Sequence, residues 1–326
     1  MRKQEKMKKD SHNHDLMQPA QGQGMTRGLI IGIALNMIIV AAEVVIGLLA
    51  NSLGLLSDAV HNFTDIAALA IVWFAFAQAK KPPTPVKTFG YHRTGILTAL
   101  INSLVMVLVT AWIFYEAYQR FMSPQPVGGA LVMVTAGVAL VANLAVVAIL
   151  RSQGSRDLNI RSAMLHLLGD AATSAAVVIA GLIIIATGWY PVDPLVSVIL
   201  GLAILWGAWK IIEETLEIFL EEAPRAVDVN RVVAEMKAED GVLDVHDIHV
   251  WTIGSELYAL SAHVLVEDIK VSESNRIMND LREMLSQDFG IVHSTLEVES
   301  SPCEIGGPYC DINNHAVSVS DSKHRH

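Results

Sequence analysis

The sequence predicts an α-helical membrane protein with six transmembrane helices followed by a cytosolic α+β domain. Of the 326 residues, 52% are hydrophobic and only 17% are charged, and the mean hydropathy of +0.42 is high for a water-soluble globular protein. Six apolar stretches are long enough to cross a bilayer, which takes about 20 residues each. After Pro224 the pattern changes to the short alternating and amphipathic segments of a soluble domain.

The predicted spans occupy the first two thirds of the chain. They cover residues 26–50, 57–79, 96–119, 127–150, 163–187 and 193–219. The chain is therefore expected to have four parts. These are a cytosolic N-terminal segment (1–25), a transmembrane domain (26–220), a cytosolic domain (224–302) and a flexible C-terminal tail (303–326).

Lys and Arg indicate which connections face the cytoplasm. The segment up to Arg27 holds six of them, the connection at 80–93 holds four and the connection at 151–161 holds three, whereas the alternate connections hold only Arg120. Cytoplasmic loops carry the excess of basic residues in membrane proteins. We therefore expect a multi-pass protein of the inner (plasma) membrane with both termini in the cytoplasm.

The C-terminal domain is predicted to contain two helices and three strands. Apolar residues recur at helical intervals in 227–240 and 272–290, whereas 242–253, 256–267 and 292–300 alternate and are rich in β-branched residues. The resulting order, αββαβ, predicts a sandwich of ferredoxin-like type.

Acidic residues are concentrated at the C-terminal end. The formal net charge is −10, and from Glu213 onward there are 23 Asp and Glu against 8 Lys and Arg, while residues 1–212 hold 10 against 15. This balance argues against nucleic acid as a partner and is compatible with attracting cations.

The second and fifth spans each carry a His and an Asp four residues apart. His61 and Asp65 form one pair, and His166 and Asp170 form the other. Residues four apart share a helix face, with Cβ atoms about 6 Å apart. Two such helices packed together would therefore bring two nitrogens and two oxygens into the tetrahedral arrangement that Zn²⁺ accepts.

Hydrogen bonding between helices is the simpler explanation for polar residues in spans. Four ionisable groups at membrane depth, however, cost on the order of 3 kcal/mol or more each and tend to line ion pathways. The duplication of the pair thus favours metal binding. Mixed imidazole and carboxylate ligands favour zinc-like ions and leave cadmium and cobalt open.

Other polar residues in the spans could either line the ion pathway or hydrogen bond between helices. They are Asn36, Glu43, Asn143 and Asp193, together with Asp58 near the membrane boundary.

Three functions could use such a metal site. A carrier could exchange Zn²⁺ for H⁺, because a metal ligand must lose its proton before it binds. An intramembrane metalloenzyme is disfavoured because the sequence has no HExxH and four ligands would close the zinc shell. A passive channel shares nearly every feature with a carrier, although channels favour weaker sites. We expect a transporter rather than an enzyme, with no cofactor.

The chain resembles the cation diffusion facilitator family, and within it the bacterial zinc exporters of the ZitB and CzcD types. The matching segments are "SLGLLSDAVHNFTD" (52–65), "FGYHR" (89–93), "NIRSAMLHLLGD" (159–170), "DPLVSVILGLAI" (193–204) and "VHDIHVW" (245–251). The likeness runs from residue 26 to about residue 302. It implies a homodimer that exchanges cytosolic Zn²⁺ for an inward H⁺ through the same four residues of the two spans.

The resemblance also implies that zinc is a regulatory ligand of the cytosolic domain. By position, His246, His263 and Glu299 fit one site, with His249 as an alternative to His246. The simpler alternative is that these strand histidines face water or satisfy hydrogen bonds of the domain.

A second cytosolic site is implied by position for His293, Cys303 and Cys310. His12 and His14 are candidates to complete these sites from the partner subunit. Against this, six residues between two cysteines is wider than the usual spacing in structural zinc sites.

Overall fold

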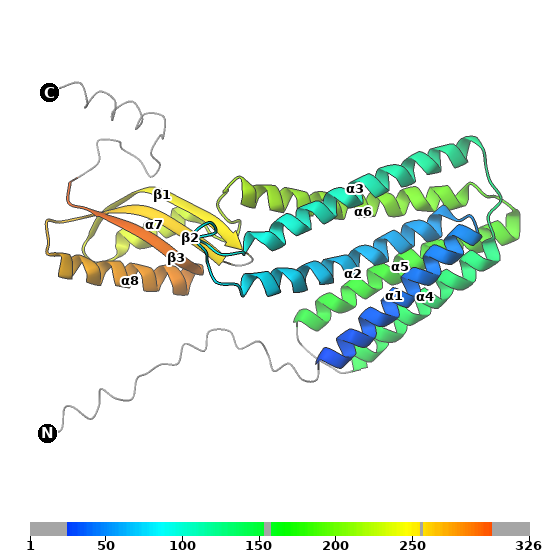
Figure 1. Ribbon diagram of the computed structural model, residues 1–326, viewed down its shortest axis with the longest axis horizontal. Coiled ribbons are helices and arrows are strands. Elements are labelled where there is room, and N and C mark those ends of the chain that lie inside the picture. The colour runs from blue at the N-terminus through cyan, green and yellow to red at the C-terminus, as the bar shows by residue number, and fades with distance from the viewer. Residues whose placement is uncertain (1–24, 153–157, 255–256, 302–326) are drawn as a thin grey trace. The chain divides into compact units, whose positions relative to one another are not determined.

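A computed structural model describes residues 25–152, 158–254 and 257–301. The chain forms two compact units, one made of residues up to Ile66 with Glu116–Leu200, and the other of Ala67–Tyr115 with Gly201 onward. Six long helices come first along the chain (Figure 1). They are α1 (Met25–Leu49), α2 (Leu53–Ala79), α3 (Arg93–Met122), α4 (Gly129–Ser152), α5 (Leu158–Thr187) and α6 (Val192–Phe219).

These helices have the length and composition of membrane spans. Among the described residues, five helices, α2 to α6, are long and apolar enough to cross a membrane. The 25-residue helix α1, of which Asn36–Leu49 is an apolar stretch, supplies the sixth. Large side chains such as Trp73 and Leu108 are exposed on these helices, as expected of a surface that faces lipid. The predicted six-helix membrane fold is confirmed.

Helices α4 and α5 pack closely over much of their length. A Cβ added at Gly129 would lie 2.8 Å from Ile184 Cγ2, and one added at Gly181 would lie 2.9 Å from the backbone nitrogen of Met133. Small residues at these points allow the two backbones to approach, as is common between membrane helices.

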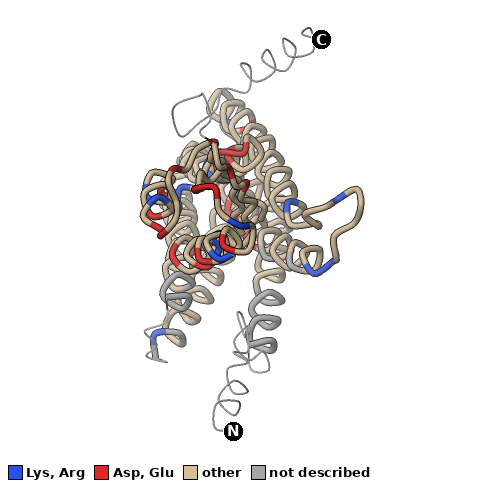
Figure 2. The backbone as a smooth tube through the Cα atoms, turned by 90° about the vertical axis from the view of Figure 1, so that its left-hand side faces the viewer, with Lys and Arg blue, Asp and Glu red and all other residues tan. Residues whose placement is uncertain are grey.

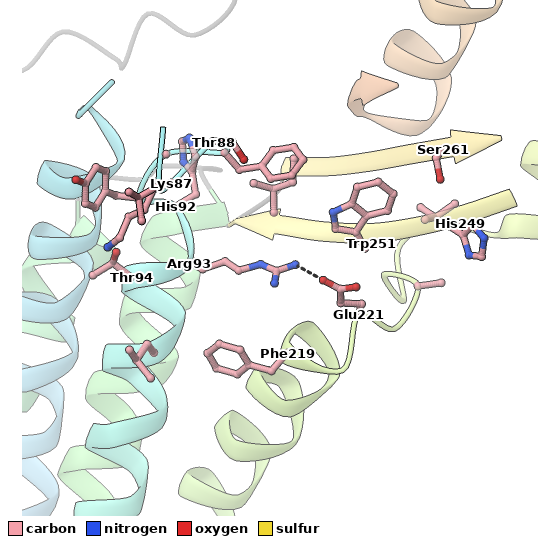
Figure 3. Close-up of a pocket in the computed structure, with 18 of the residues that line it drawn as sticks. Lys87, Thr88, His92, Arg93, Thr94, Phe219, Glu221, His249, Trp251 and Ser261 are labelled. Atoms are coloured by element: carbon pink, nitrogen blue, oxygen red, sulfur yellow. Dashed lines mark hydrogen bonds and ion pairs between the residues drawn. The ribbon is translucent and has the colours of Figure 1, made fainter. Parts of the chain in front are cut away.

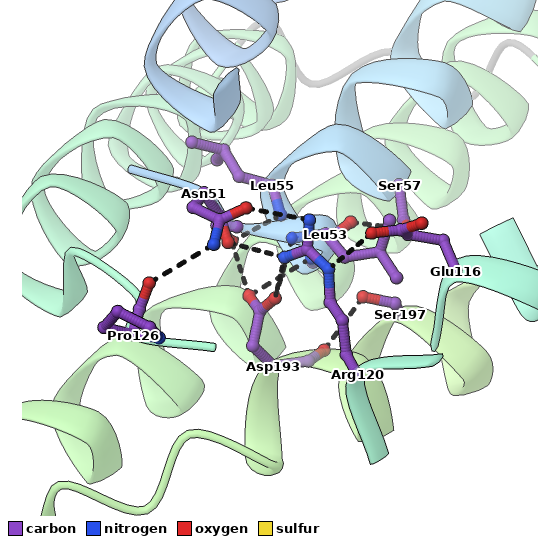
Figure 4. Close-up of polar contacts among 11 residues, drawn as sticks. Asn51, Leu53, Leu55, Ser57, Glu116, Arg120, Pro126, Asp193 and Ser197 are labelled. Carbon is purple, nitrogen blue, oxygen red and sulfur yellow. Dashed lines mark hydrogen bonds and ion pairs between the residues drawn. The ribbon is translucent and has the colours of Figure 1, made fainter. Parts of the chain in front are cut away.

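The beginning of α2 is fixed to α6 by the carboxylate of Asp193 (Figure 4). This side chain is fully buried. Its Oδ2 accepts a hydrogen bond from the backbone N–H of Leu53 at 2.7 Å, and its Oδ1 accepts from the backbone N–H of Gly54 at 3.2 Å and from the Ser52 hydroxyl. The first N–H groups of a helix have no partner within it, so Asp193 caps α2.

Arg120 extends this network from the end of α3. Its Nη1 donates to the backbone oxygen of Asn51 at 2.6 Å, its Nη2 donates to Asn51 Oδ1 at 2.9 Å, and its Nε donates to Glu116 Oε1 at 3.0 Å. Arg120 Nη1 also lies 3.8 Å from Asp193 Oδ2. The buried carboxylate therefore has a cationic partner.

The C-terminal domain has the predicted order αββαβ. Its elements are α7 (Val229–Ala238), β1 (Val242–Gly254), β2 (Leu257–Val266), α8 (Val271–Phe289) and β3 (Ile291–Glu299). The sheet has the order β1-β2-β3, with β1 antiparallel and β3 parallel to β2. The parallel pair requires a crossover connection, which α8 provides. The fold class predicted for this domain is confirmed.

The two faces of this sheet differ. Leu260, Ala262, Val264 and Val266 alternate along β2, so they point to one face, where α7 and α8 pack and complete the core. The residues between them, including His263, point to the opposite face. That face is therefore free of the helices that cover the core side.

Acidic side chains gather on this domain, as the composition predicts. Figure 2 shows Asp and Glu positions over its helices and strands, with fewer Lys and Arg positions among them. Arg225, which lies between α6 and α7, forms ion pairs with Glu213 and Glu217 near the end of α6.

Candidate metal sites

The two HxxxD pairs of α2 and α5 meet in the structure. His61 Nε2 lies 3.5 Å from Asp170 Oδ1, and His166 Nε2 lies 3.5 Å from Asp65 Oδ2 and 3.9 Å from Asp170 Oδ2. The closest nitrogen–oxygen contacts thus run between the helices rather than within each one. Residues about 100 positions apart in sequence form one cluster of two imidazoles and two carboxylates.

The spacing of these atoms suits a tetrahedral zinc ion. Ligand atoms at about 2.0–2.1 Å from a tetrahedral zinc lie about 3.3 Å from one another. The two 3.5 Å separations are close to that value, and ligand atoms of His61, Asp65 and Asp170 all lie within 4.8 Å of one another. His166 is the most open member, with 52% of its side chain exposed. His166 lies outside that group of three but contacts both of its carboxylates, at 3.5 Å from Asp65 Oδ2 and 3.9 Å from Asp170 Oδ2.

Buried oxygens in this cluster lack hydrogen bonds. Asp65 Oδ2 and Asp170 Oδ1 are buried and have no hydrogen-bond partner among the residues that the structure describes. Buried polar groups are normally satisfied. Two unsatisfied carboxylate oxygens that face histidine nitrogens are therefore suited to receive a cation.

A second group of ligands lies on the helix-free face of the C-terminal sheet. His246 pairs directly with His263 across β1 and β2, and their rings are 5.3 Å apart. Glu299 joins them from β3, with Oε2 3.1 Å from His246 Nε2 and Oε1 2.9 Å from His263 Nδ1. His246 Nε2 and Glu299 Oε2 are buried, but the described residues give neither a hydrogen bond. The structure thus brings together the three residues expected to form the first cytosolic site.

Two further carboxylates beside this group were not predicted. Asp247 Oδ2 lies 3.6 Å and Glu297 Oε2 lies 3.5 Å from His263 Nε2. Asp247 sits at an irregularity in the β1 register between His246 and His249, with φ of 49°. Positive φ is uncommon for residues other than glycine, and this bulge turns the Asp247 carboxylate toward the histidines. Asp247 lies within the segment "VHDIHVW" that carries the family resemblance, but the spacing in that segment could not reveal the bulge.

Two other predicted cytosolic ligands, His249 and His293, lie apart from the group formed by His246, His263 and Glu299. His249 Nε2 is 3.2 Å from Asp247 Oδ1, so it reaches the group only through that residue. His293 lies at the beginning of β3 against the ring of Phe89, with ring centroids 5.5 Å apart. Four residues of strand, about 13 Å, separate it from Glu297. His293 therefore does not belong to the group formed by His246, His263 and Glu299.

The other members of the second cytosolic site fall in the terminal segments of the chain. Cys303 and Cys310 lie outside the described residues, as do the candidate accessory ligands His12 and His14. The second site remains a prediction.

His249 also lines a pocket of about 890 Å³, together with Lys87, Arg93 and Trp251 (Figure 3). Arg93 crosses this pocket, where its Nη2 donates to Glu221 Oε1 at 3.2 Å and to the backbone oxygen of Thr252 at 3.3 Å. The pocket contains neither of the two ligand groups.

Comparison with known proteins identifies the family of the chain. The family model described as cation efflux transmembrane domain matches residues 29–220, and the model described as cation efflux protein, cytoplasmic domain matches residues 224–301. The metal cation efflux system protein CzcD of Cupriavidus metallidurans is 38% identical over 293 residues, which cover 90% of this chain and 91% of that protein.

Two further relatives are similar over most of their length. The zinc transporter ZitB of Escherichia coli is 37% identical over 286 residues, covering 87% of this chain and 89% of that protein. The cadmium, cobalt and zinc/H(+)-K(+) antiporter of Bacillus subtilis is 36% identical over 261 residues, covering 79% and 84%. These relatives are named as transporters and not as enzymes. The chain accordingly belongs to the cation efflux family of membrane transporters, which is also called the cation diffusion facilitator family.

Proposed function

We propose that this protein exports Zn²⁺ from the cytoplasm in exchange for H⁺. In this proposal His61, Asp65, His166 and Asp170 hold the ion during transport. The observation that carries the proposal is the approach of these side chains across α2 and α5, with 3.5 Å between paired nitrogen and oxygen atoms. The names of the relatives, which include a zinc transporter and a zinc/H(+)-K(+) antiporter, support both the cargo and the exchange.

The ligand chemistry supports zinc-like ions as the cargo. Two imidazole nitrogens and two carboxylate oxygens suit Zn²⁺, whereas an all-oxygen site would suit Mg²⁺, Ca²⁺ or Mn²⁺. Cd²⁺ and Co²⁺ accept the same ligands, and one relative is named for cadmium, cobalt and zinc. We propose zinc as the principal cargo, with cadmium and cobalt as further ions.

Exchange with protons follows from competition for the same lone pairs. A histidine or carboxylate must be deprotonated before it binds a metal, so metal binding releases protons. Protonation of His61 or His166 on the more acidic side of the membrane would favour release of the ion there. The return stroke would then carry the proton inward, and rocking of helices about a fixed site would alternate access.

The group formed by His246, His263 and Glu299 is proposed as a regulatory zinc site. Its donors suit zinc, with Asp247 and Glu297 beside them as further oxygen ligands. The matched cytoplasmic domain belongs to a type named for dimerisation, which supports a homodimer. We propose that zinc bound here draws two cytosolic domains together and favours one transport state.

We also propose where the protein resides in the cell and where its domains begin and end. Basic residues in the N-terminal segment and in the connections at 80–93 and 151–161 support an inner-membrane protein with both termini in the cytoplasm. The transmembrane domain is placed at 26–220 and the cytosolic domain at 224–302, with an N-terminal segment and a C-terminal tail outside them.

Zinc uptake into proteoliposomes tests the transport function. With an acidic lumen, the purified protein should accumulate Zn²⁺ against its concentration gradient, and a protonophore should stop this accumulation. His166→Ala and Asp65→Ala should each abolish uptake while folding and dimerisation persist. Asp288→Ala, at an exposed position of α8, is the matched control and should transport normally.

Two results would contradict the proposal. Purely downhill flux that ignores the pH gradient would indicate a passive channel. Normal uptake by His166→Ala and Asp65→Ala would remove the proposed site.

A further inference from the structure

Two buried carboxyl groups lie close to the transport site but outside the four ligands. Glu43 of α1 and Asp58 of α2 are both fully buried. Glu43 Oε2 accepts a hydrogen bond from Asn62 Nδ2 at 2.9 Å, and Asp58 Oδ2 accepts one from Ser174 Oγ at 3.1 Å. Neither Asn62 nor Ser174 is a proposed ligand, so these two contacts leave the metal site intact.

The second oxygen of each carboxyl group is unsatisfied. Glu43 Oε1 and Asp58 Oδ1 are buried, and no hydrogen-bond partner for either is found in the described part of the chain. No ion pair joins either residue to a Lys or Arg within the described ranges. An isolated buried carboxylate costs several kcal/mol, and hydrocarbon surroundings add to that cost. A bound proton removes the charge.

The pair is attached to the helices that supply the transport ligands. Asp58 precedes His61 by three residues of α2, which places them on neighbouring positions of one helix face. Ser174 follows Asp170 by four residues of α5. A change of charge at the transport site therefore acts on this pair over a short distance through a medium of low dielectric constant.

The charged groups near Glu43 can be named helix by helix. Asp58 and His61 of α2 and Asp170 of α5 act on it electrostatically. The helix α4, which contacts α1, has no titratable side chain from Gly129 to Ile149. Negative charge from the carboxylates thus dominates the surroundings of Glu43 when no cation is near.

We propose that Glu43 and Asp58 form a proton-carrying pair that loses a proton when zinc enters the neighbouring site and regains one when zinc leaves. The inference rests on the proposed zinc/H⁺ exchange and names residues that serve it. Without an ion, the negative charge of Asp170 repels a charge on the pair, and burial adds to this, so the pair stays protonated. A Zn²⁺ ion in the neighbouring site cancels this repulsion, so a carboxyl proton is released.

The direction of exchange follows from where zinc binds and leaves. Zinc arrives from the cytoplasm, so the proton it displaces is released to the cytoplasm. When zinc leaves on the other side, the pair takes up a proton from that side. One cycle therefore moves zinc outward and a proton inward.

The pH dependence of zinc affinity tests this inference in the full-length protein. The slope of log Kd for Zn²⁺ against pH counts the protons released on binding. Glu43→Gln should still bind zinc, but its slope should be smaller than that of the unaltered protein by up to about one proton per zinc. The amide of this variant keeps an oxygen that can accept the Asn62 hydrogen bond, so a purely structural role for Glu43 predicts no change in slope.

Controls separate this inference from the proposed function. Glu235→Gln makes the same chemical change on the cytosolic helix α7 and should leave the slope unchanged. Protons released at the cytosolic zinc site contribute equally to the slope in every variant, so that contribution cancels in the comparison. If Glu43→Gln does not fold, Asp58→Asn gives the same test with the same expectation. An unaltered slope in the folded variant overturns the proton-carrying pair. Unaltered zinc uptake by His166→Ala would instead overturn the transport site itself.

Discussion

The Asp193 carboxylate at the start of α6 accepts a hydrogen bond from the backbone N–H of Leu53, the first residue of α2, at 2.7 Å. His61 and Asp65 lie in the same helix, two and three turns further on. The contact therefore fixes the end of the helix that presents half of the proposed transport site. It joins residues 140 positions apart.

Asp193→Ala should destabilise the protein and impair transport. The change leaves buried N–H groups of α2 without an acceptor and removes the carboxylate 3.8 Å from Arg120 Nη1, although Arg120 keeps its contact with Glu116. Loss of a helix cap costs about 0.5–2 kcal/mol, and loss of the nearby carboxylate adds to that cost. The thermal unfolding midpoint in detergent should fall clearly, whereas the exposed control Asp288→Ala should leave it nearly unchanged. An unaltered midpoint would contradict the capping role.

His61→Asp should weaken the preference for zinc over cadmium and other divalent ions. The change replaces an imidazole nitrogen by an oxygen and so alters the ligand type that favours zinc. We expect the ratio of zinc to competing-ion affinity to fall by about tenfold, which corresponds to ~1.4 kcal/mol. Competition by Cd²⁺ or Mn²⁺ against zinc uptake measures this ratio. His92→Asp is the matched control, and equal ratios in both variants would argue against His61 as a ligand.

Periodicity explains why much of the proposed transport site could be predicted. A four-residue spacing fixes a common helix face whatever the rest of the fold does, so His61 and Asp65 can be selected without knowledge of their neighbours. The same argument selects His166 and Asp170. Hydropathy predicts the helices, and alternation predicts the strands of the C-terminal domain.

Contacts that depend on tertiary structure could not be predicted in this way. The hydrogen bond from Asn62 to Glu43 depends on how α1 packs against α2. The position of Asp247 depends on a bulge with φ of 49°, which one sequence does not reveal. The sequence allows Glu43 to be either a pathway residue or a hydrogen-bonding residue, and only the structure shows its unsatisfied oxygen.

Glu299→Gln should weaken zinc binding by the cytosolic domain more than Glu297→Gln. Glu299 contacts both His246 and His263, at 3.1 and 2.9 Å, whereas Glu297 is 3.5 Å from His263 and is 68% exposed. Loss of a ligand or of a group that supports one lowers metal affinity by about 10–100-fold. We expect an effect of that size for Glu299→Gln and a smaller one for Glu297→Gln.

Zinc titration in a His166→Ala background measures the cytosolic site alone. The two substitutions make the same chemical change two residues apart on one strand, so each controls for the other. Equal losses would contradict the leading role of Glu299, and a larger loss for Glu297→Gln would mean that Glu297 is the principal carboxylate ligand.

Asp244→Asn should reduce stability at neutral pH by less than about 1 kcal/mol, because the ion pair involved is exposed to solvent and screened. Lys237 Nζ lies 2.5 Å from Asp244 Oδ1, and its hydrogen bond lowers the pKa of Asp244 below the ordinary value. The folded-state pKa is thus below the unfolded-state value of about 3.9. The contribution is fully present above that value and is lost as the pH falls through the folded-state pKa.

Urea unfolding of the full-length protein and of Asp244→Asn at about pH 7 and about pH 3.5 measures this difference. The gap between the two proteins should be larger at neutral pH and shrink in acid, because protonated Asp244 no longer attracts Lys237. Asp240→Asn provides the matched control, since Asp240 is 96% exposed and lies 4.0 Å from Arg276 Nη2. Its effect should be smaller than that of Asp244→Asn at neutral pH. A gap that widens in acid would show that Asp244 stabilises the domain by some means other than its charge.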